Sequence, residues 1–266
     1  MEKIVLLIVD PQNDFCHPEG ALYVPGAERD ARRLGRLITR LRERIAKIHV
    51  TLDTHHYMDI AHPVFWLDKD GQHPPPFTII TEGDIEKGIW RPANPSLGEY
   101  VSTYARRLRE NDRYDLCVWP PHTIIGSWGH NVVKPVYEAL VQWEESVGIV
   151  DFVTKGVNFL TEHYSAIQAD VPDPADPSTM PNRRLIEKLR QADVMAVAGE
   201  ALSHCVANTV RDFIRQCKDE EVARLVLVED ATSPVKGFEE VARDFVDEMR
   251  GRGMRTVKAE DFLKEA

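Results

Sequence analysis

Short apolar runs alternate with longer amphipathic stretches along most of the chain. The runs are rich in β-branched residues and apolar throughout, which is typical of strands buried on both faces of a parallel sheet. They cover residues 4–9, 45–52, 149–154, 194–198, 225–229 and 255–258. An apolar repeat of 3.6 residues predicts helices packed on this sheet. It is present at residues 30–44, 182–191, 205–217 and 238–250.

This alternation predicts an α/β fold of three layers, α-β-α, with a mostly parallel six-stranded sheet and right-handed crossovers. The length of 266 residues fits a single domain spanning residues 1–266. Residues 63–121 interrupt the rhythm, because they are rich in proline, aromatic and turn residues and contain one expected helix, at residues 97–111. A segment of this length is usually functional or a subunit contact. We interpret it as an insertion that forms a lid over the mouth of the site.

The charge balance narrows the range of partners. The formal net charge is -10, whereas binding to nucleic acid or to an anionic membrane surface requires a basic face. The chain has no run of about 18 apolar residues and no signal-peptide pattern at its start. We therefore expect a cytoplasmic protein that acts on a small molecule. Four cysteines at irregular spacing predict free thiols rather than a disulfide framework.

Three of the strand-like runs lead to side chains with reactive groups. Asp10 follows the first run, Lys155 directly follows the third, and Cys205 follows the fourth after a short turn. Because the carboxyl ends of parallel strands lie at one edge of a sheet, the three side chains are expected to meet there. A cysteine at a helix N-terminus beside an amine is expected to have a lowered pKa. Asp10 would then exchange a proton with the thiol and a leaving amine. The alternative is a buried structural cysteine beside an ion pair.

Three segments that contain these residues carry a resemblance. LLIVDPQNDFCHPEGALYVPGA, DFVTKG followed by HYSA, and GEALSHCVANT resemble the signature segments of the isochorismatase-like cysteine hydrolases, in particular the nicotinamidase-related subgroup. The resemblance implies the isochorismatase-like hydrolase fold and amide hydrolysis through a thioester acyl-enzyme, with ammonia leaving first. It implies that Asp10 is the general base and acid, Lys155 the stabilising amine and Cys205 the nucleophile. It also implies an oxyanion hole from the backbone N–H groups of Ala201 and Cys205, with a cis peptide bond before Ala201.

A second group of residues predicts a metal site. Asp53 and His55 follow the second strand-like run, and His122 lies in the sequence WPPH, which resembles the metal segment of the same family. One carboxylate and two imidazoles with open coordination positions suit a divalent metal, with Zn²⁺ as the first choice and Fe²⁺ or Mn²⁺ as alternatives. In the family this metal binds the ring nitrogen of the substrate. The candidates for a fourth ligand are His62 and, less favoured, His56 and His73. A polar surface loop is the alternative for any single histidine.

Three further residues are expected to line the substrate pocket. Phe15 and Trp119 match the family's positions that sandwich the substrate ring, although core packing is an alternative for Phe15. Glu200 stands where relatives commonly have an aliphatic residue. We expect its carboxylate to face the pocket, where it would repel a carboxylated substrate or bind a cationic or hydrogen-donating one.

The leading hypothesis is a metal-containing cysteine amidase that cleaves a small carboxamide such as nicotinamide. One alternative is a metal-independent hydrolase of a carbamoyl or ureido amide on the same fold. Another is a non-catalytic binding scaffold, which is disfavoured because the acid, amine and thiol would then have no use. Isochorismate hydrolysis is disfavoured because those relatives lack the nucleophilic cysteine. The resemblance also implies a homo-oligomer, either a dimer or a tetramer.

Overall fold

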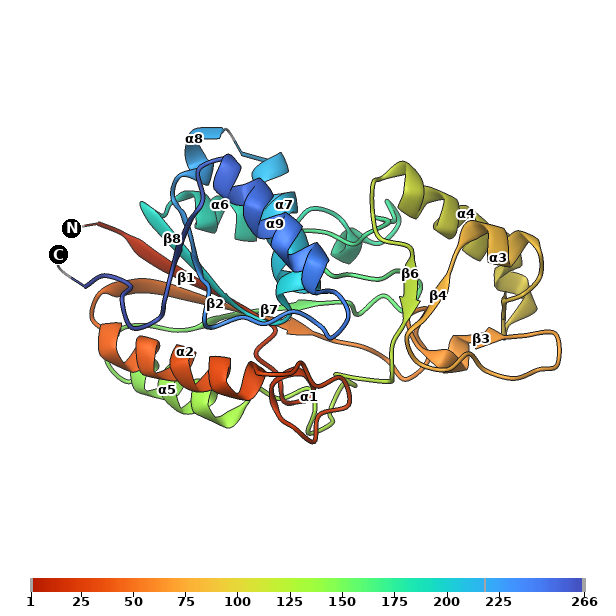
Figure 1. Cartoon of the computed structure of the whole chain (residues 1–266), viewed down its shortest axis with the longest axis horizontal. Helices are drawn as coiled ribbons and strands as arrows, with labels where there is room; N and C mark the ends of the chain where they lie inside the picture. The colour runs from red at the N-terminus through yellow and green to blue at the C-terminus, as the bar shows by residue number, and fades with distance from the viewer. Residues whose placement is uncertain (1, 218, 265–266) are drawn as a thin grey trace.

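A six-stranded parallel sheet forms the centre of the protein. The computed structural model describes residues 2–217 and 219–264. The strand order is β10-β9-β8-β1-β2-β7, and every pair of neighbours runs parallel (Figure 1). The predicted three-layer architecture is confirmed, and the sheet is wholly rather than mostly parallel. The strands are β1 (Ile4–Val9), β2 (Ile45–Asp53), β7 (Asp151–Lys155), β8 (Val194–Gly199), β9 (Leu225–Val228) and β10 (Arg255–Val257).

The two middle strands are apolar because both of their faces are covered. Every residue of β1 and β8 is buried. Their register places Val9 opposite Gly199, where β8 turns away from the sheet. Gly199 has a φ of 107°, and a Cβ atom there would lie 2.0 Å from the carbonyl oxygen of Val9. Only glycine fits this position, since both the backbone conformation and the space exclude a side chain.

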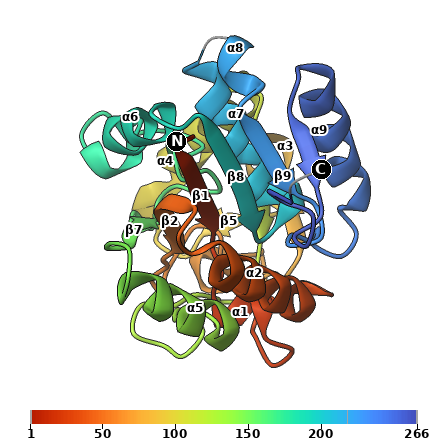
Figure 2. The same cartoon turned by 90° about the vertical axis from the view of Figure 1, so that its left-hand side faces the viewer.

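Helices pack on both faces of the sheet (Figure 2). The first face is covered by α2 and α5, and the other by α6, α7 and α9, as Figures 1 and 2 both show. Each helix turns a stripe of apolar side chains toward the sheet; in α2 the buried residues include Leu34, Leu37, Ile38 and Leu41. The helices are α2 (Ala27–Leu41), α5 (Lys134–Glu144), α6 (Arg183–Arg190), α7 (Ala207–Arg215) and α9 (Glu239–Gly251), with two short ones, α1 (Asn13–Cys16) and α8 (Asp219–Val222).

The predicted insertion, residues 63–121, has a structure of its own. Two antiparallel strand pairs, β3 with β5 and β4 with β6, accompany two helices at the end of the molecule opposite the termini (Figure 1). A second apolar cluster, which includes Trp66, Tyr104 and Val118, holds these elements together. The elements are β3 (Trp66–Leu67), β4 (Thr78–Ile80), α3 (Glu82–Glu86), β5 (Arg91–Pro92), α4 (Gly98–Glu110) and β6 (Leu116–Val118). The expected helix at residues 97–111 corresponds to α4.

Among the described residues, none of the helices combines the length and the apolar character that crossing a membrane requires. That the chain forms a single domain, with residues 63–121 as a lid, stays a prediction.

Candidate active site

The carboxyl ends of the central strands bring the predicted reactive residues together. Asp53 ends β2 and pairs in register with Lys155 at the end of β7. Asp10 follows β1 with a φ of 43°, a left-handed conformation that Asp tolerates better than most residues. The hydroxyl of Thr51 donates to Asp10 Oδ1 at 2.5 Å and accepts from the Asp10 N–H at 3.0 Å. The carboxylate is therefore held at the sheet edge by a neighbouring strand.

Lys155 joins these groups through a single ammonium. Its Nζ lies 2.7 Å from Asp53 Oδ1, 2.9 Å from Asp10 Oδ2, 2.9 Å from the carbonyl oxygen of His163 and 3.6 Å from Cys205 Sγ. Burial alone would lower the pKa of Lys155, but Asp10 and Asp53 raise it well above its ordinary value. The ammonium thus stays charged inside the protein and links the acid, the thiol and the second carboxylate.

Cys205 lies in a π-helical turn, Leu202–Val206, which leads directly into α7. The expectation of a lowered thiol pKa is wrong for this structure. Burial raises the pKa of Cys205 well above its ordinary value; Lys155 lowers it, and the carboxylates of Asp10 and Asp53 raise it further. Desolvation and two nearby anions therefore outweigh the helix terminus. The thiol of Cys205 therefore holds its proton, and the carboxyl group of Asp10 lies beside it.

Asp53, His55 and His122 form the predicted three-residue group. Their ligand atoms all lie within 4.8 Å of one another, and all three residues are buried. Asp53 Oδ2 lies 3.0 Å from His55 Nε2 and 3.4 Å from His122 Nε2. Its other oxygen is the one that binds Lys155. Asp53 therefore connects the three-residue group to the thiol of Cys205 through Lys155.

The Nδ1 atoms of His55 and His122, which face away from Asp53, also have hydrogen-bond partners. His55 Nδ1 lies 2.9 Å from Asp59 Oδ2, and His122 Nδ1 lies 2.9 Å from the carbonyl oxygen of Pro120. Both Nε2 atoms therefore face Asp53. Outer partners of this kind orient histidine ligands in metal sites, so the donor set and its supports fit a divalent metal. Sequence reasoning missed Asp59, because an acid four residues after His55 gives no signal of its own.

The additional histidines differ in position. His62 is buried, and its Nε2 lies 3.3 Å from His122 Nδ1, beside the three-residue group rather than within it. Burial lowers the pKa of His62 to about 2, so the ring is neutral. His56 is exposed, and the exposed His73 bonds the carbonyl oxygen of Trp66. The structure therefore does not bring His56 or His73 to the site.

A pocket opens directly above these groups. Phe15 and Trp119, which the sequence placed against a substrate ring, both line it, as do Cys205, Ala201 and His122. Phe15 contacts His122 edge to face, with ring centroids 5.4 Å apart. The pocket is thus bounded by flat apolar surfaces, the thiol and one edge of the metal group. The remaining lining residues are Leu22, Asp53, Glu162, Tyr164, His204 and Val235.

Sequence reasoning did not single out three lining residues that carry polar groups, Glu162, Tyr164 and His204. Glu162 Oε1 accepts from the His163 N–H at 2.8 Å, while Oε2 has no hydrogen-bond partner within the described chain. Burial raises the pKa of Glu162 to about 8. His204 precedes the thiol, and burial lowers its pKa to about 3. The family resemblance of the segment HYSA, residues 163–166, indicated the loop that carries Glu162 but not Glu162 itself.

The expectation for Glu200 is wrong. Its carboxyl group is buried but is not among the groups that line the pocket. It points instead toward Asp30 of α2, and its Oε2 accepts from the Ser233 N–H at 3.0 Å. Ala201, which a cis peptide bond joins to Glu200, lines the pocket in its place. The cis bond lies where the resemblance implied it.

Comparison with known proteins gives a consistent result. No protein-family model matches the chain. The nicotinamidase of Saccharomyces cerevisiae is 26% identical over 254 residues, which cover 95% of this chain and 98% of that one. The structure of the yeast nicotinamidase superposes with a TM-score of 0.67 at 21% identity, covering 96% and 99% of the two chains. The chain shares the isochorismatase-like hydrolase fold. The resemblance that its motifs indicated is confirmed.

Two further solved structures support the shared fold. The Acinetobacter nicotinamidase and pyrazinamidase has a TM-score of 0.65 at 20% identity, with 99% of each chain covered. The Pyrococcus horikoshii pyrazinamidase in complex with zinc has a TM-score of 0.57 at 20% identity, with 96% of this chain and 99% of that one covered.

Proposed function

We propose that this protein is a cysteine amidase that hydrolyses a small carboxamide, with nicotinamide as the leading substrate. The observation that carries the proposal is the position of Cys205 Sγ, which lies 3.6 Å from Lys155 Nζ in a pocket walled by Phe15 and Trp119. The same ammonium holds Asp10 at 2.9 Å. A thiol, its base and a flat apolar slot are thus assembled in one place, and the relatives named above are nicotinamidases.

The first half of the reaction forms the thioester. Cys205 Sγ attacks the carboxamide carbon while Asp10 takes the thiol proton. The oxygen of the tetrahedral intermediate accepts hydrogen bonds from the backbone N–H groups of Ala201 and Cys205. When the C–N bond breaks, Asp10 gives its proton to the nitrogen and ammonia leaves. Lys155 keeps its positive charge throughout, and so stabilises the sulfur anion as it develops.

The second half returns the enzyme to its starting state. Asp10 takes a proton from a water molecule, which attacks the thioester carbon in the position left by ammonia. The C–S bond then breaks, the carboxylic acid is released and the sulfur of Cys205 recovers a proton from Asp10. The same two side chains therefore serve both steps.

We propose that Asp53, His55 and His122 hold Zn²⁺. His62 lies close enough to His122 either to become a fourth ligand or to orient the His122 ring. When bound, such a metal supplies a Lewis-acidic position that a ring nitrogen can occupy. The protein contributes the orientation, because Asp59 and Pro120 fix the two rings. The alternative, a metal-independent hydrolase of carbamoyl or ureido amides, leaves this held donor set without a use.

The substrate class is tested by ammonia release from a panel of amides. Nicotinamide and pyrazinamide each have a ring nitrogen meta to the carboxamide, benzamide has no ring nitrogen, and N-carbamoyl compounds represent the alternative. We expect turnover of the first two, with benzamide at least about 10-fold slower because it has no metal-binding atom. Turnover of the carbamoyl compounds alone would overturn the proposal in favour of the alternative.

The metal site is tested by replacing two adjacent histidines. His55→Ala removes a proposed ligand, while His56→Ala changes an exposed neighbour and serves as the matched control. After purification with Zn²⁺, metal analysis should show His55→Ala depleted and His56→Ala equal to the unmodified protein. Activity on nicotinamide should fall at least about 10–100-fold only in the first variant. An undiminished metal content in His55→Ala would contradict the site.

A further inference from the structure

The turn of residues 199–203, which precedes Cys205, is hydrogen-bonded to the loop of residues 231–235, which follows β9. The Gly199 N–H donates to the carbonyl oxygen of Ala231, and the Leu202 N–H to that of Ser233, both at 2.9 Å. The Val235 N–H donates to Ser203 Oγ at 3.1 Å. Three bonds thus fix residues 199–203 against residues 231–235. This turn carries Ala201, whose N–H is one of the two proposed oxyanion donors, so its position decides where a carbonyl oxygen can be held.

The side chain of Glu200 adds a fourth attachment from inside the protein. Glu200 is 1% exposed, and its Oε2 accepts from the Ser233 N–H at 3.0 Å. Ser233 Oγ in turn lies 2.5 Å from Asp30 Oδ2 on α2. Ser233 thus bridges the carboxyl groups of Asp30 and Glu200, which also lie within hydrogen-bonding reach of each other. A carboxyl–carboxyl hydrogen bond requires one proton between the two groups.

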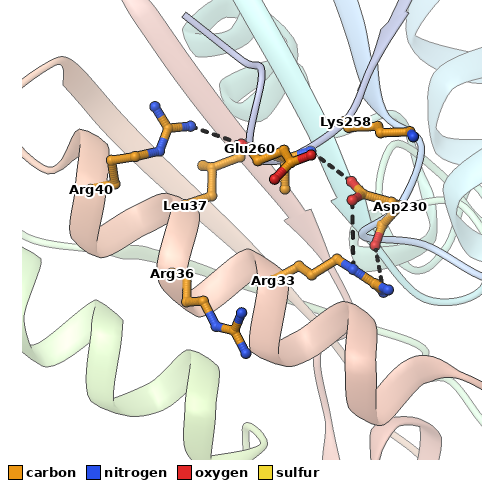
Figure 3. A pocket seen from close by; sticks show the side chains of 8 residues that line it. Arg33, Arg36, Leu37, Arg40, Asp230, Lys258 and Glu260 are labelled. Atoms are coloured by element: carbon orange, nitrogen blue, oxygen red, sulfur yellow. Dashed lines mark hydrogen bonds and ion pairs between the residues drawn. The ribbon is translucent and has the colours of Figure 1, made fainter. Parts of the chain in front are cut away.

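Near the protein surface, Arg33 binds both Asp30 and the loop that contains Ser233. Arg33, one turn along α2, lies 3.1 Å from Asp30 Oδ1 and 3.6 Å from Asp230 Oδ2, and it also donates to the Asp230 carbonyl oxygen at 3.2 Å. Figure 3 shows its guanidinium reaching from α2 to Asp230. Arg33 thus ties α2 to the same loop that contains Ser233, and its charge favours ionised Asp30 over ionised Glu200.

We propose that Asp30, Ser233 and Glu200 form a positioning unit for the oxyanion turn, in which Glu200 acts as a neutral acid that donates to Asp30. The inference rests on the proposed function, since it assigns these residues to the geometry of Ala201. Glu200 touches neither the pocket nor the thiol. It acts through the turn, and it explains why an acid at this position does not repel a substrate.

The charges around the unit set its response to pH. Burial raises the pKa of Glu200 well above its ordinary value, and the anionic groups of Asp30 and Glu28 raise it further. Burial also raises the pKa of Asp30, against the effect of Arg33 and Arg29. Burial raises the pKa of the neighbouring Cys16 thiol, and the charges of Glu200 and Asp30 raise it further. Because the folded state holds the Glu200 proton more firmly than the unfolded state, its contribution to stability is lost as pH rises through the folded-state pKa.

Glu200→Gln and Glu200→Ala separate the neutral-acid role from simple packing. Gln can donate to Asp30 and accept from Ser233, so we expect kcat and KM for nicotinamide within about 2-fold of the unmodified protein. Ala removes both bonds, and we expect kcat to fall about 10–100-fold with KM little changed, in line with loss of oxyanion stabilisation. The rate of Cys205 alkylation by iodoacetamide should be the same in all three proteins, because Asp10 and Lys155 are untouched. Glu229→Gln, which changes an exposed acid directly after β9, is the control.

Three results would overturn the proposal. One is an unchanged kcat in Glu200→Ala. Another is an equal loss in Glu200→Gln, which would mean that a charged carboxylate is needed. A third is a parallel fall in the alkylation rate, which would place the damage at the thiol.

Thermal unfolding distinguishes a failure of this unit from a failure of the proposed function. If the unmodified protein releases no ammonia from any amide, the proposed function fails, but the shared proton remains measurable. The melting temperature of the unmodified protein should then fall relative to that of Glu200→Gln as pH is raised above about 4.5, the ordinary pKa of Glu. A constant difference from pH 5 to pH 9 would overturn the neutral-acid assignment.

Discussion

Cys205→Ala should lower the rate of ammonia release by about three orders of magnitude or more and leave the fold intact. The variant removes the only atom that can form the thioester, and losses of this size follow when a nucleophile is deleted from a site whose other groups remain. The side chain lost is small, so the free energy of unfolding should change by no more than about 1–2 kcal/mol. The assay is steady-state ammonia release, with circular dichroism to verify folding.

Cys217→Ala is the matched control for Cys205→Ala. Cys217 is a free, half-buried cysteine that lies outside the pocket residues, so its variant should keep the full rate. Residual activity within about 10-fold of the unmodified protein in Cys205→Ala would contradict covalent catalysis by this thiol.

Lys155→Met should be among the most destabilising single substitutions in this protein. It keeps the length of the side chain but leaves Asp10 and Asp53 as two buried anions with no ammonium between them. Breaking a buried ion pair in this way costs about 3–5 kcal/mol. We expect a loss of that size in the free energy of unfolding at pH 8, measured by urea denaturation, together with loss of activity.

The pH dependence of the Lys155→Met effect follows from Asp10. Burial already raises the pKa of Asp10, and Lys155 opposes that rise. Without the ammonium, the folded-state pKa rises further, so the variant gains stability relative to the unmodified protein as pH falls and the carboxyl groups take up protons. Lys155→Met combined with Asp10→Asn should recover part of the loss at pH 8. A destabilisation below about 1 kcal/mol at pH 8 would contradict the linking role of Lys155.

The arrangement of the reactive groups could be predicted because it follows from topology. Once the apolar runs are assigned to a parallel sheet, the residues that follow them must lie at one edge, and Asp10, Lys155 and Cys205 do meet there. The grouping of Asp53, His55 and His122 needed the family resemblance in addition, because His122 comes from a distant loop.

The details that escaped prediction depend on side-chain direction and burial. Nothing local indicated that Glu200 would turn toward Asp30 on α2, since that contact joins residues far apart in the chain. A helix terminus after Cys205 predicts a low thiol pKa, but burial of the thiol raises it, and the buried carboxylates of Asp10 and Asp53 raise it further; the local sequence shows neither. The internal strands of residues 63–121 are two or three residues long, too short to produce a periodic signal.

The most direct test of the account is the reaction of nicotinamide with the unmodified protein purified in the presence of Zn²⁺. We expect ammonia and nicotinate to be released in equal amounts, at a rate that saturates with nicotinamide and falls to background in Cys205→Ala. Release of no ammonia by folded, metal-loaded protein, or release at the same rate by Cys205→Ala, would contradict it.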